Sequence, residues 1–221
     1  MSFYAAEFVA LWLYIKFVKK TFFSELFRRT GGWRRYCLAG FLLATLHNII
    51  DLTVSIFIMG REHGFILPFY IHLPVYFLSY MFISISEEGV FRGCILGGLL
   101  NRHGVIFSII FSSLLFGLYH FSYPSLFYGL SGAIMMATYI FQSFTAGLFL
   151  AYFYHKTGGS LVGPVSYHFS QMFFNIPYVW MEPASISFRV QPLLPEFWWL
   201  LQGTPHILNV IQILILRKIR F

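Results

Sequence analysis

The sequence predicts an all-α integral membrane protein, a polytopic bundle of about seven (six to eight) transmembrane helices. Of its 221 residues, 58% are hydrophobic and only 10% are charged, whereas a soluble domain carries about 25% charged residues. The 28 phenylalanines would leave large apolar patches on a water-exposed surface. Helices are expected because a segment in hydrocarbon must satisfy its own backbone hydrogen bonds. At about 20 residues a span, the length fits a single transmembrane domain over residues 1–221.

Apolar segments, separated by polar or glycine-containing turns, run along the whole chain. The expected helical segments are residues 3–18, 36–59, 65–100, 105–121, 126–154, 161–180 and 197–216. Turn residues at 101–104 and 155–160 separate the middle segments. Pro164 fits the first turn of its helix, and Pro205 is expected to kink the last helix.

Polar side chains inside the first two segments have ordinary explanations. Glu7 and Lys16 lie near the ends of the first segment, where long side chains can reach the interface. His47 and Asp51 lie one turn apart in the second segment, where hydrogen bonds between helices are expected. A proton relay or gate is the alternative for this pair.

The basic residues indicate how the chain is oriented in the bilayer. If residues 65–100 cross once, Arg102, Lys156 and residues 217–220 lie on the same side as the basic stretch 19–35. The positive-inside rule makes that side cytoplasmic, and we expect the cytoplasmic membrane of a prokaryote. Because topology explains the net charge of +7, no nucleic-acid partner is predicted, and the lipid bilayer is the expected surroundings.

Two carboxylates and an arginine interrupt the third apolar segment. A charge at the bilayer centre costs about 2.5–3.5 kcal/mol, so charges there usually serve a function. On a helix, Glu88 and Arg92 are i,i+4 neighbours and can form an ion pair. Glu87 lies about 100° away around the axis and is free to act as a base. A water-exposed charged patch at a helix end is the alternative.

Histidines on two later helices are candidates to join these carboxylates. Glu87 and His120 lie almost equally far from the turn at His103, both about 24–26 Å away along their helices. His168 shares one helical face with Gln171, Met172 and Asn175. It lies only ~12–15 Å from its own turn. Either that turn sinks into the bilayer, or the alignment of the three groups is imperfect.

Together these elements resemble the CAAX protease and bacteriocin-processing family, which includes the prenyl-protein endopeptidase that trims farnesylated C-termini. The family's E-E-x-x-x-R, F-x-x-x-H and histidine motifs are carried in order by Glu87, Glu88, Arg92, Phe116, His120 and His168. The resemblance covers about residues 75–176. Met172 departs from it, because the family has Asn or Asp four residues after the last histidine.

The resemblance implies a glutamate-dependent intramembrane endopeptidase that cuts a membrane-associated protein or peptide, lipidated in the family's best-known case. Glu87 would be the general base, His120 would orient the attacking water, and His168 would donate to the oxyanion. Glu88 and Arg92 would be a supporting pair, and Phe116 would have a structural role. Without an amide at Met172, either Gln171 or Asn175 would replace it, or the activity is altered or lost.

The same residues are compatible with other functions. Glu87, His120 and His168 could hold zinc, although no H-E-x-x-H is present and no cofactor is expected. A catalytically inactive family member acting as a membrane immunity or partner protein is a second hypothesis, motivated by Met172. A proton-coupled transporter is a third, but the sequence has no paired inverted repeats.

Overall fold

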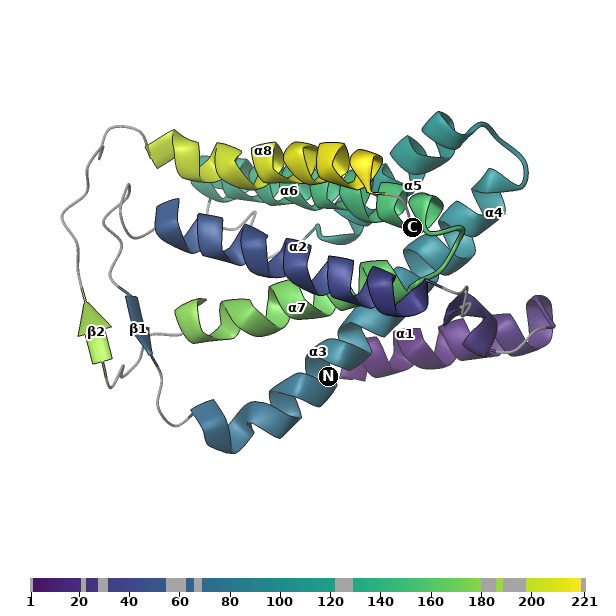
Figure 1. The fold of residues 1–221 in the computed structure, drawn as a ribbon, viewed down its shortest axis with the longest axis horizontal. Helices are drawn as coiled ribbons and strands as arrows, with labels where there is room; N and C mark the ends of the chain where they lie inside the picture. Colours follow the sequence, from purple (N-terminus) through teal and green to yellow (C-terminus); the bar gives the residue numbers. More distant parts are fainter. Residues whose placement is uncertain are drawn as a thin grey trace.

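The computed structural model describes residues 2–20, 23–27, 32–54, 63–65, 69–121, 129–179, 186–188 and 198–219. These residues are helical apart from turns and one short ribbon, so the all-α prediction is confirmed in its main feature (Figure 1). In chain order the elements are α1 (Ser2–Leu13), η1 (Tyr14–Val18), η2 (Phe23–Phe27), α2 (Trp33–Thr53), β1 (His63–Phe65), α3 (Phe69–Glu88), η4 (Gly89–Leu96), α4 (Gly97–Leu100), α5 (Val105–Tyr119), α6 (Gly129–Lys156), α7 (Val162–Val179), β2 (Ile186–Phe188) and α8 (Trp198–Lys218).

The ribbon is the departure from helical structure within the described residues. Strands β1 and β2 pair antiparallel, with His63 opposite Phe188 and Phe65 opposite Ile186. Both strands lie in connections between helices, where backbone groups lack the partners that a helix provides. Pairing satisfies these groups and ties the connection before α3 to the one before α8.

The lengths of several helices suit a bilayer. In the described part of the chain, Trp33–Thr53 and Gly132–Lys156 are long and apolar enough to cross a membrane. Val105–Tyr119 is apolar but shorter. Residues 69–100 form one helical run, made of α3, η4 and α4.

This long run changes its winding directly after Glu87 and Glu88. Residues Gly89–Leu96 form a π-helix, in which Gly97 N–H donates to Arg92 O, five residues earlier. Such wide turns are rare and occur mostly at functional sites. The apolar pattern of the sequence did not predict this change of winding.

Helices α2 and α7 pack closely because glycine lies at their contact. A Cβ on Gly40 would lie 2.5 Å from Gly163 O, so no larger residue fits there. Tyr167 ties both helices to α8, because its hydroxyl lies 3.0 Å from His47 Nδ1 and donates to Gln212 Oε1 at 3.0 Å. His47 therefore makes the interhelical hydrogen bond that the sequence predicted.

The turn between α6 and α7 is partly buried, with Gly158 exposed. Its residues Thr157, Ser160 and Leu161 are almost fully covered, and Leu161 N–H donates to Leu26 O of η2 at 3.0 Å. Its two glycines have φ of 68° and 85°, left-handed conformations that glycine adopts without strain. Packing against η2 thus fixes the position at which α7 begins.

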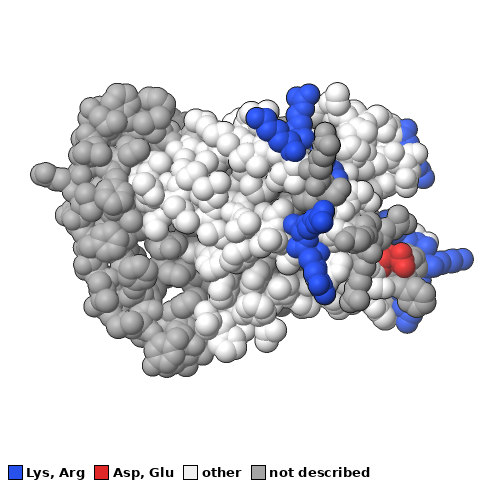
Figure 2. All heavy atoms as spheres, in the orientation of Figure 1, with Lys and Arg blue, Asp and Glu red and all other residues white. Residues whose placement is uncertain are grey.

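Basic side chains gather toward one end of the molecule. Figure 2 shows Lys and Arg over this end, where α2 begins and α8 ends, with the rest of the described surface almost free of charge. The described basic residues other than Arg92 are Lys16, Lys19, Lys20, Arg34, Arg35, Arg102, Lys156, Arg217 and Lys218. The arrangement agrees with the alternation of sides predicted from the sequence.

Candidate active site

Glu87 and Glu88 end α3 inside the molecule. Their side chains are only 2% and 0% exposed, and Arg92 of η4 is fully buried as well. A buried charge costs several kcal/mol unless a partner compensates it. The partners of each carboxylate therefore decide its chemical state and what it can do.

Glu88 is held by two cationic or proton-donating partners. Arg92 Nη1 lies 3.2 Å from Glu88 Oε1, which is the i,i+4 ion pair predicted from the sequence. His168 Nδ1 of α7 lies 2.9 Å from the same oxygen. Arg92 also donates to Gly147 O of α6 at 3.3 Å. Glu88 thus joins the motif on α3 to α7 and fixes the His168 ring.

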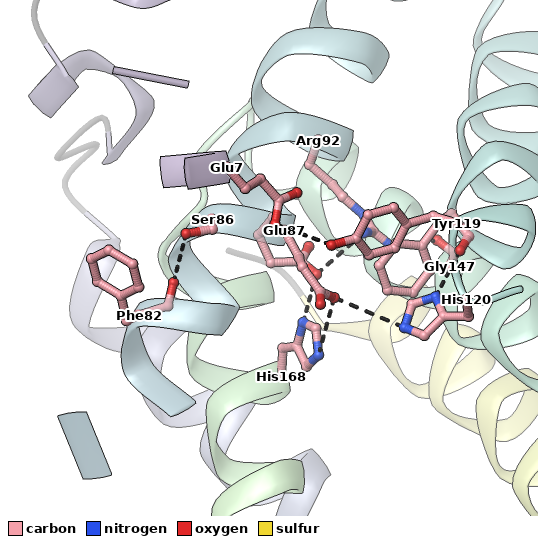
Figure 3. A network of polar contacts seen from close by, with 11 residues as sticks. Glu7, Phe82, Ser86, Glu87, Arg92, Tyr119, His120, Gly147 and His168 are labelled. Atoms are coloured by element: carbon pink, nitrogen blue, oxygen red, sulfur yellow. Dashed lines mark hydrogen bonds and ion pairs between the residues drawn. The ribbon is translucent and has the colours of Figure 1, made fainter. Parts of the chain in front are cut away.

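Glu87 faces two imidazole rings. Its Oε2 lies 3.8 Å from His168 Nε2 and 4.0 Å from His120 Nε2, and the three side chains converge in Figure 3. The prediction that Glu87 and His120 lie at one depth is therefore correct. His168 reaches the same carboxylate oxygen from α7.

Hydrogen bonds at the other ring nitrogens fix the orientation of both histidines. His120 Nδ1 lies 2.8 Å from Phe116 O, and because a carbonyl oxygen only accepts, this nitrogen carries a proton. His168 Nδ1 likewise donates to the Glu88 carboxylate. The Nε2 atoms of both rings are consequently left to face Glu87.

The Phe116 ring packs against three side chains of this cluster. Its ring is almost fully buried and makes edge-to-face contacts with His120 and His168, at centroid distances of 4.7 and 6.2 Å. The Arg92 guanidinium lies over it, 4.2 Å from the ring centroid. Phe116 thus packs against both imidazole rings and the Arg92 guanidinium.

The separations around Glu87 suit a small bridging molecule. They exceed the 2.7–3.2 Å of a direct hydrogen bond, so a single oxygen atom at roughly 2.8 Å from each partner fits between Glu87 and either ring. Glu87 Oε2 is buried and has no hydrogen-bond partner among the described residues. A carboxylate and two imidazoles aimed at one point can bind and deprotonate a water molecule.

The same three side chains are less well spaced for zinc. Ligands about 2.0–2.1 Å from a tetrahedral zinc lie roughly 3.3–3.4 Å apart. Glu87 is 3.8 and 4.0 Å from the two Nε2 atoms, so the side chains would have to move together to hold the ion. The described residues contain no group of three or more His, Cys, Asp or Glu arranged for a metal.

The position of the family's amide is occupied by Met172. It lies in α7 one turn after His168, is partly buried and carries no N–H donor on its side chain. Gln171 is partly buried beside it, and its backbone carbonyl accepts from Asn48 Nδ2 at 3.3 Å. The side chain of Asn175 lies outside the described part of the structure.

Sequence reasoning missed two residues that lie at the site. Glu7 was assigned to the membrane interface, but it is partly buried and accepts a hydrogen bond from Tyr119 at 3.1 Å (Figure 3). The one signal in the sequence was a carboxylate inside an apolar segment. Gly147, whose carbonyl oxygen binds Arg92, left no signal, because a backbone acceptor can belong to any residue.

Comparison with protein-family models gives one match. Residues 68–174 match the family described as type II CAAX prenyl endopeptidase, Rce1-like. The matched range contains Glu87, Glu88, Arg92, His120 and His168. No curated protein and no solved structure matches the chain.

Proposed function

We propose that this chain, whose residues 68–174 match the Rce1-like family of type II CAAX prenyl endopeptidases, is a glutamate-dependent intramembrane endopeptidase. Its substrate would be a membrane-associated protein or peptide, lipidated or unlipidated. The observation that carries the proposal is the convergence of His120 Nε2 and His168 Nε2 on the buried, unpaired oxygen of Glu87.

Peptide hydrolysis at this site begins with a water molecule between Glu87 and the two rings. Glu87 takes one proton from the water, and the oxygen attacks the scissile carbonyl carbon to give a tetrahedral oxyanion. The carbon–nitrogen bond then breaks, and the leaving nitrogen receives the proton that Glu87 holds. His120 orients the water, since its ring is fixed by the hydrogen bond to Phe116 O.

His168 is suited to stabilise the oxyanion when it is an imidazolium. Two ionised glutamates balance Arg92 and one imidazolium, so the four groups are together neutral, which suits a buried cluster. Glu88 accepts the Nδ1 proton of this ring, and Nε2–H is then a donor toward the reacting atoms. Glu88 and Arg92 would act as positioning residues in this mechanism.

Met172 leads us to expect a low kcat. Loss of one oxyanion donor typically lowers kcat by about 10²–10³. A second donor from Gln171 or Asn175 would restore part of this loss. We therefore propose a working but slow peptidase, in which His168 supplies the main oxyanion contact.

The proposal includes a multi-pass arrangement without a metal. The helical run at 69–100 and helices α2, α5, α6, α7 and α8 would cross the bilayer, and α1 would line part of the site. The basic end would face the cytoplasm, in the cytoplasmic membrane of a prokaryote. Catalysis by Glu87 needs no cofactor in this scheme.

A second candidate function is that of a non-catalytic partner or immunity protein in the membrane. The observation that favours it is Met172, which provides no amide where the family has one. In this case the Glu87 cluster would serve stability alone, and its removal would not change processing of any protein.

Comparative membrane proteomics separates these functions. Cells carrying Glu87→Gln or His120→Ala are compared with wild type, and Glu25→Gln serves as a control because Glu25 is an exposed carboxylate of η2. The peptidase predicts that the same uncleaved precursor accumulates with Glu87→Gln and His120→Ala but not with the control. Identical membrane proteomes in all strains, at equal protein levels, would favour the non-catalytic function.

A further inference from the structure

The first helix packs directly on the helix that carries the glutamate pair, although it lies outside the matched residues 68–174. Leu11 of α1 is buried against Gly89, where a Cβ would lie 2.3 Å from Leu11 Cδ2. The rings of Phe8 and Phe82 are 4.6 Å apart between the same two helices. Gly89 therefore admits α1 to a position immediately beside Glu87 and Glu88.

A second set of contacts holds the segment that follows α1. Lys19 Nζ donates to Gly93 O at 3.0 Å. Leu26 of η2 lies against the same glycine, where a Cβ would come within 2.9 Å of Leu26 Cδ2. Because Gly89 and Gly93 bracket the turn that contains Arg92, α1, Lys19 and Leu26 are built into the wall of the site.

This packing brings a third carboxylate to the site. Glu7 lies one turn before Leu11, and its Oε2 accepts a hydrogen bond from the Tyr119 hydroxyl at 3.1 Å. Tyr119 directly precedes His120, and Figure 3 shows Glu7 next to Glu87. Glu7 is thus close to the reacting atoms without belonging to the motifs.

The charges of the site do not balance once Glu7 is included. Arg92 is the one Lys or Arg in the described part of the chain that is ion-paired with any of the three glutamates. With one imidazolium and all three carboxylates ionised, the site would carry about one negative charge. Glu7 has only a neutral phenol as its hydrogen-bond donor, and Glu87 Oε2 is buried without a hydrogen bond within the described residues. A cation from outside the chain would compensate this charge.

We infer that Glu7, oriented by Tyr119, is a specificity residue that binds a cationic side chain of the substrate, Lys or Arg, close to the scissile bond. A substrate cation would complete the charge balance of the site as it binds, which favours cationic over neutral sequences. This inference rests on the proposed function, since it concerns the substrate of the same site.

The test uses the full-length protein in liposomes and a farnesylated peptide that ends in a CAAX box. A single Lys, Gln or Glu is placed in turn at the two positions on either side of the prenylated cysteine, and kcat/KM is measured for each peptide. We expect the wild type to prefer Lys over Gln about tenfold at one position. Glu7→Gln should remove the preference, and Glu7→Lys should make the Glu peptide the better substrate.

The outcomes are separable from those of the proposed function. Equal rates for Lys and Gln peptides at every position in the wild type would overturn the inference while leaving the peptidase intact. A preference that persists in Glu7→Gln would also overturn it. Cleavage of no farnesylated peptide by the wild type would overturn the inference for a prenylated substrate, while the membrane proteomics above tests the peptidase separately. Glu25→Gln is the matched control and should keep the wild-type preference.

Discussion

Glu88 and His168 form a hydrogen bond of 2.9 Å between a helix end and a neighbouring helix, and this contact organises the whole cluster. It occupies Nδ1 of the ring, so that Nε2 faces the carboxylate of Glu87 at 3.8 Å. The same Glu88 oxygen also holds Arg92 at 3.2 Å. One buried carboxylate thus connects the ion pair of the motif to the proposed oxyanion donor.

Removal of Arg92 alone should destabilise the protein strongly. Arg92→Met leaves Glu88 with His168 as its one proton donor among the described residues, and breaking a buried ion pair costs about 3–5 kcal/mol. The double variant Glu88→Gln/Arg92→Met removes both charges and should lose less stability than the sum of the single variants. Thermal unfolding in detergent measures all three variants. Strict additivity would show that the two side chains are not coupled.

Restoring the family's amide should raise the rate of cleavage. Met172→Asn places an N–H donor one turn after His168, and we expect kcat to increase by about 10- to 100-fold. This is less than the roughly 10²–10³ of a full oxyanion donor, because Gln171 or Asn175 would already restore part of the loss. Met172→Leu preserves the volume without a donor and should leave kcat unchanged. If Met172→Asn gains nothing while Gln171→Ala loses activity, Gln171 already supplies the donor. If neither variant changes kcat, the proposed oxyanion deficit is wrong.

The contact between Gly89 and Leu11 should make any side chain larger than glycine at position 89 destabilising. Gly89→Ala drives a methyl group to 2.3 Å from Leu11 Cδ2, and overpacking of this kind costs typically 1–3 kcal/mol. Leu11→Ala in the same chain should recover part of the loss. Gly98→Ala is the control: no atom lies within 4 Å of its Cβ, and alanine favours helix over glycine by about 1 kcal/mol. Equal effects of Gly89→Ala and Gly98→Ala on the unfolding temperature would argue against α1 packing there.

Chelators should leave the activity unchanged if Glu87 acts without a metal. The spacing of Glu87 from the two imidazoles is wider than zinc ligands adopt, so peptide cleavage should survive dialysis against EDTA and phenanthroline. Cleavage by the purified protein is measured before and after dialysis. Loss of activity that zinc restores would instead assign Glu87, His120 and His168 as metal ligands.

Several parts of the site follow from short-range rules that operate in any helical membrane protein. Glu88 and Arg92 pair because residues four apart share a helical face. Glu87 and His120 meet because they are almost equally far along the chain from the turn that joins their two helices. In an antiparallel pair of helices, such residues lie side by side. Phe116 packs below His120 for the same reason of spacing.

Other parts depend on contacts between segments that are distant in the sequence. The position of His168 depends on the turn before α7, which packs against Leu26 of η2. No local pattern of the sequence predicts the π-helix at Gly89–Leu96. Glu7 was placed at the interface because an isolated charge near a segment end is usually solvated. Its partner Tyr119 lies more than a hundred residues away.

The central claim is that Glu87 activates the water that cleaves the peptide bond. The most direct measurement is the rate of cleavage of a farnesylated CAAX peptide by purified wild type and Glu87→Gln in liposomes, with equal folding shown by thermal unfolding. Glutamine keeps the shape of the side chain but cannot take a proton, so we expect the rate to fall by at least about 10²-fold, with KM little changed. Cleavage by Glu87→Gln at the wild-type rate would contradict the account.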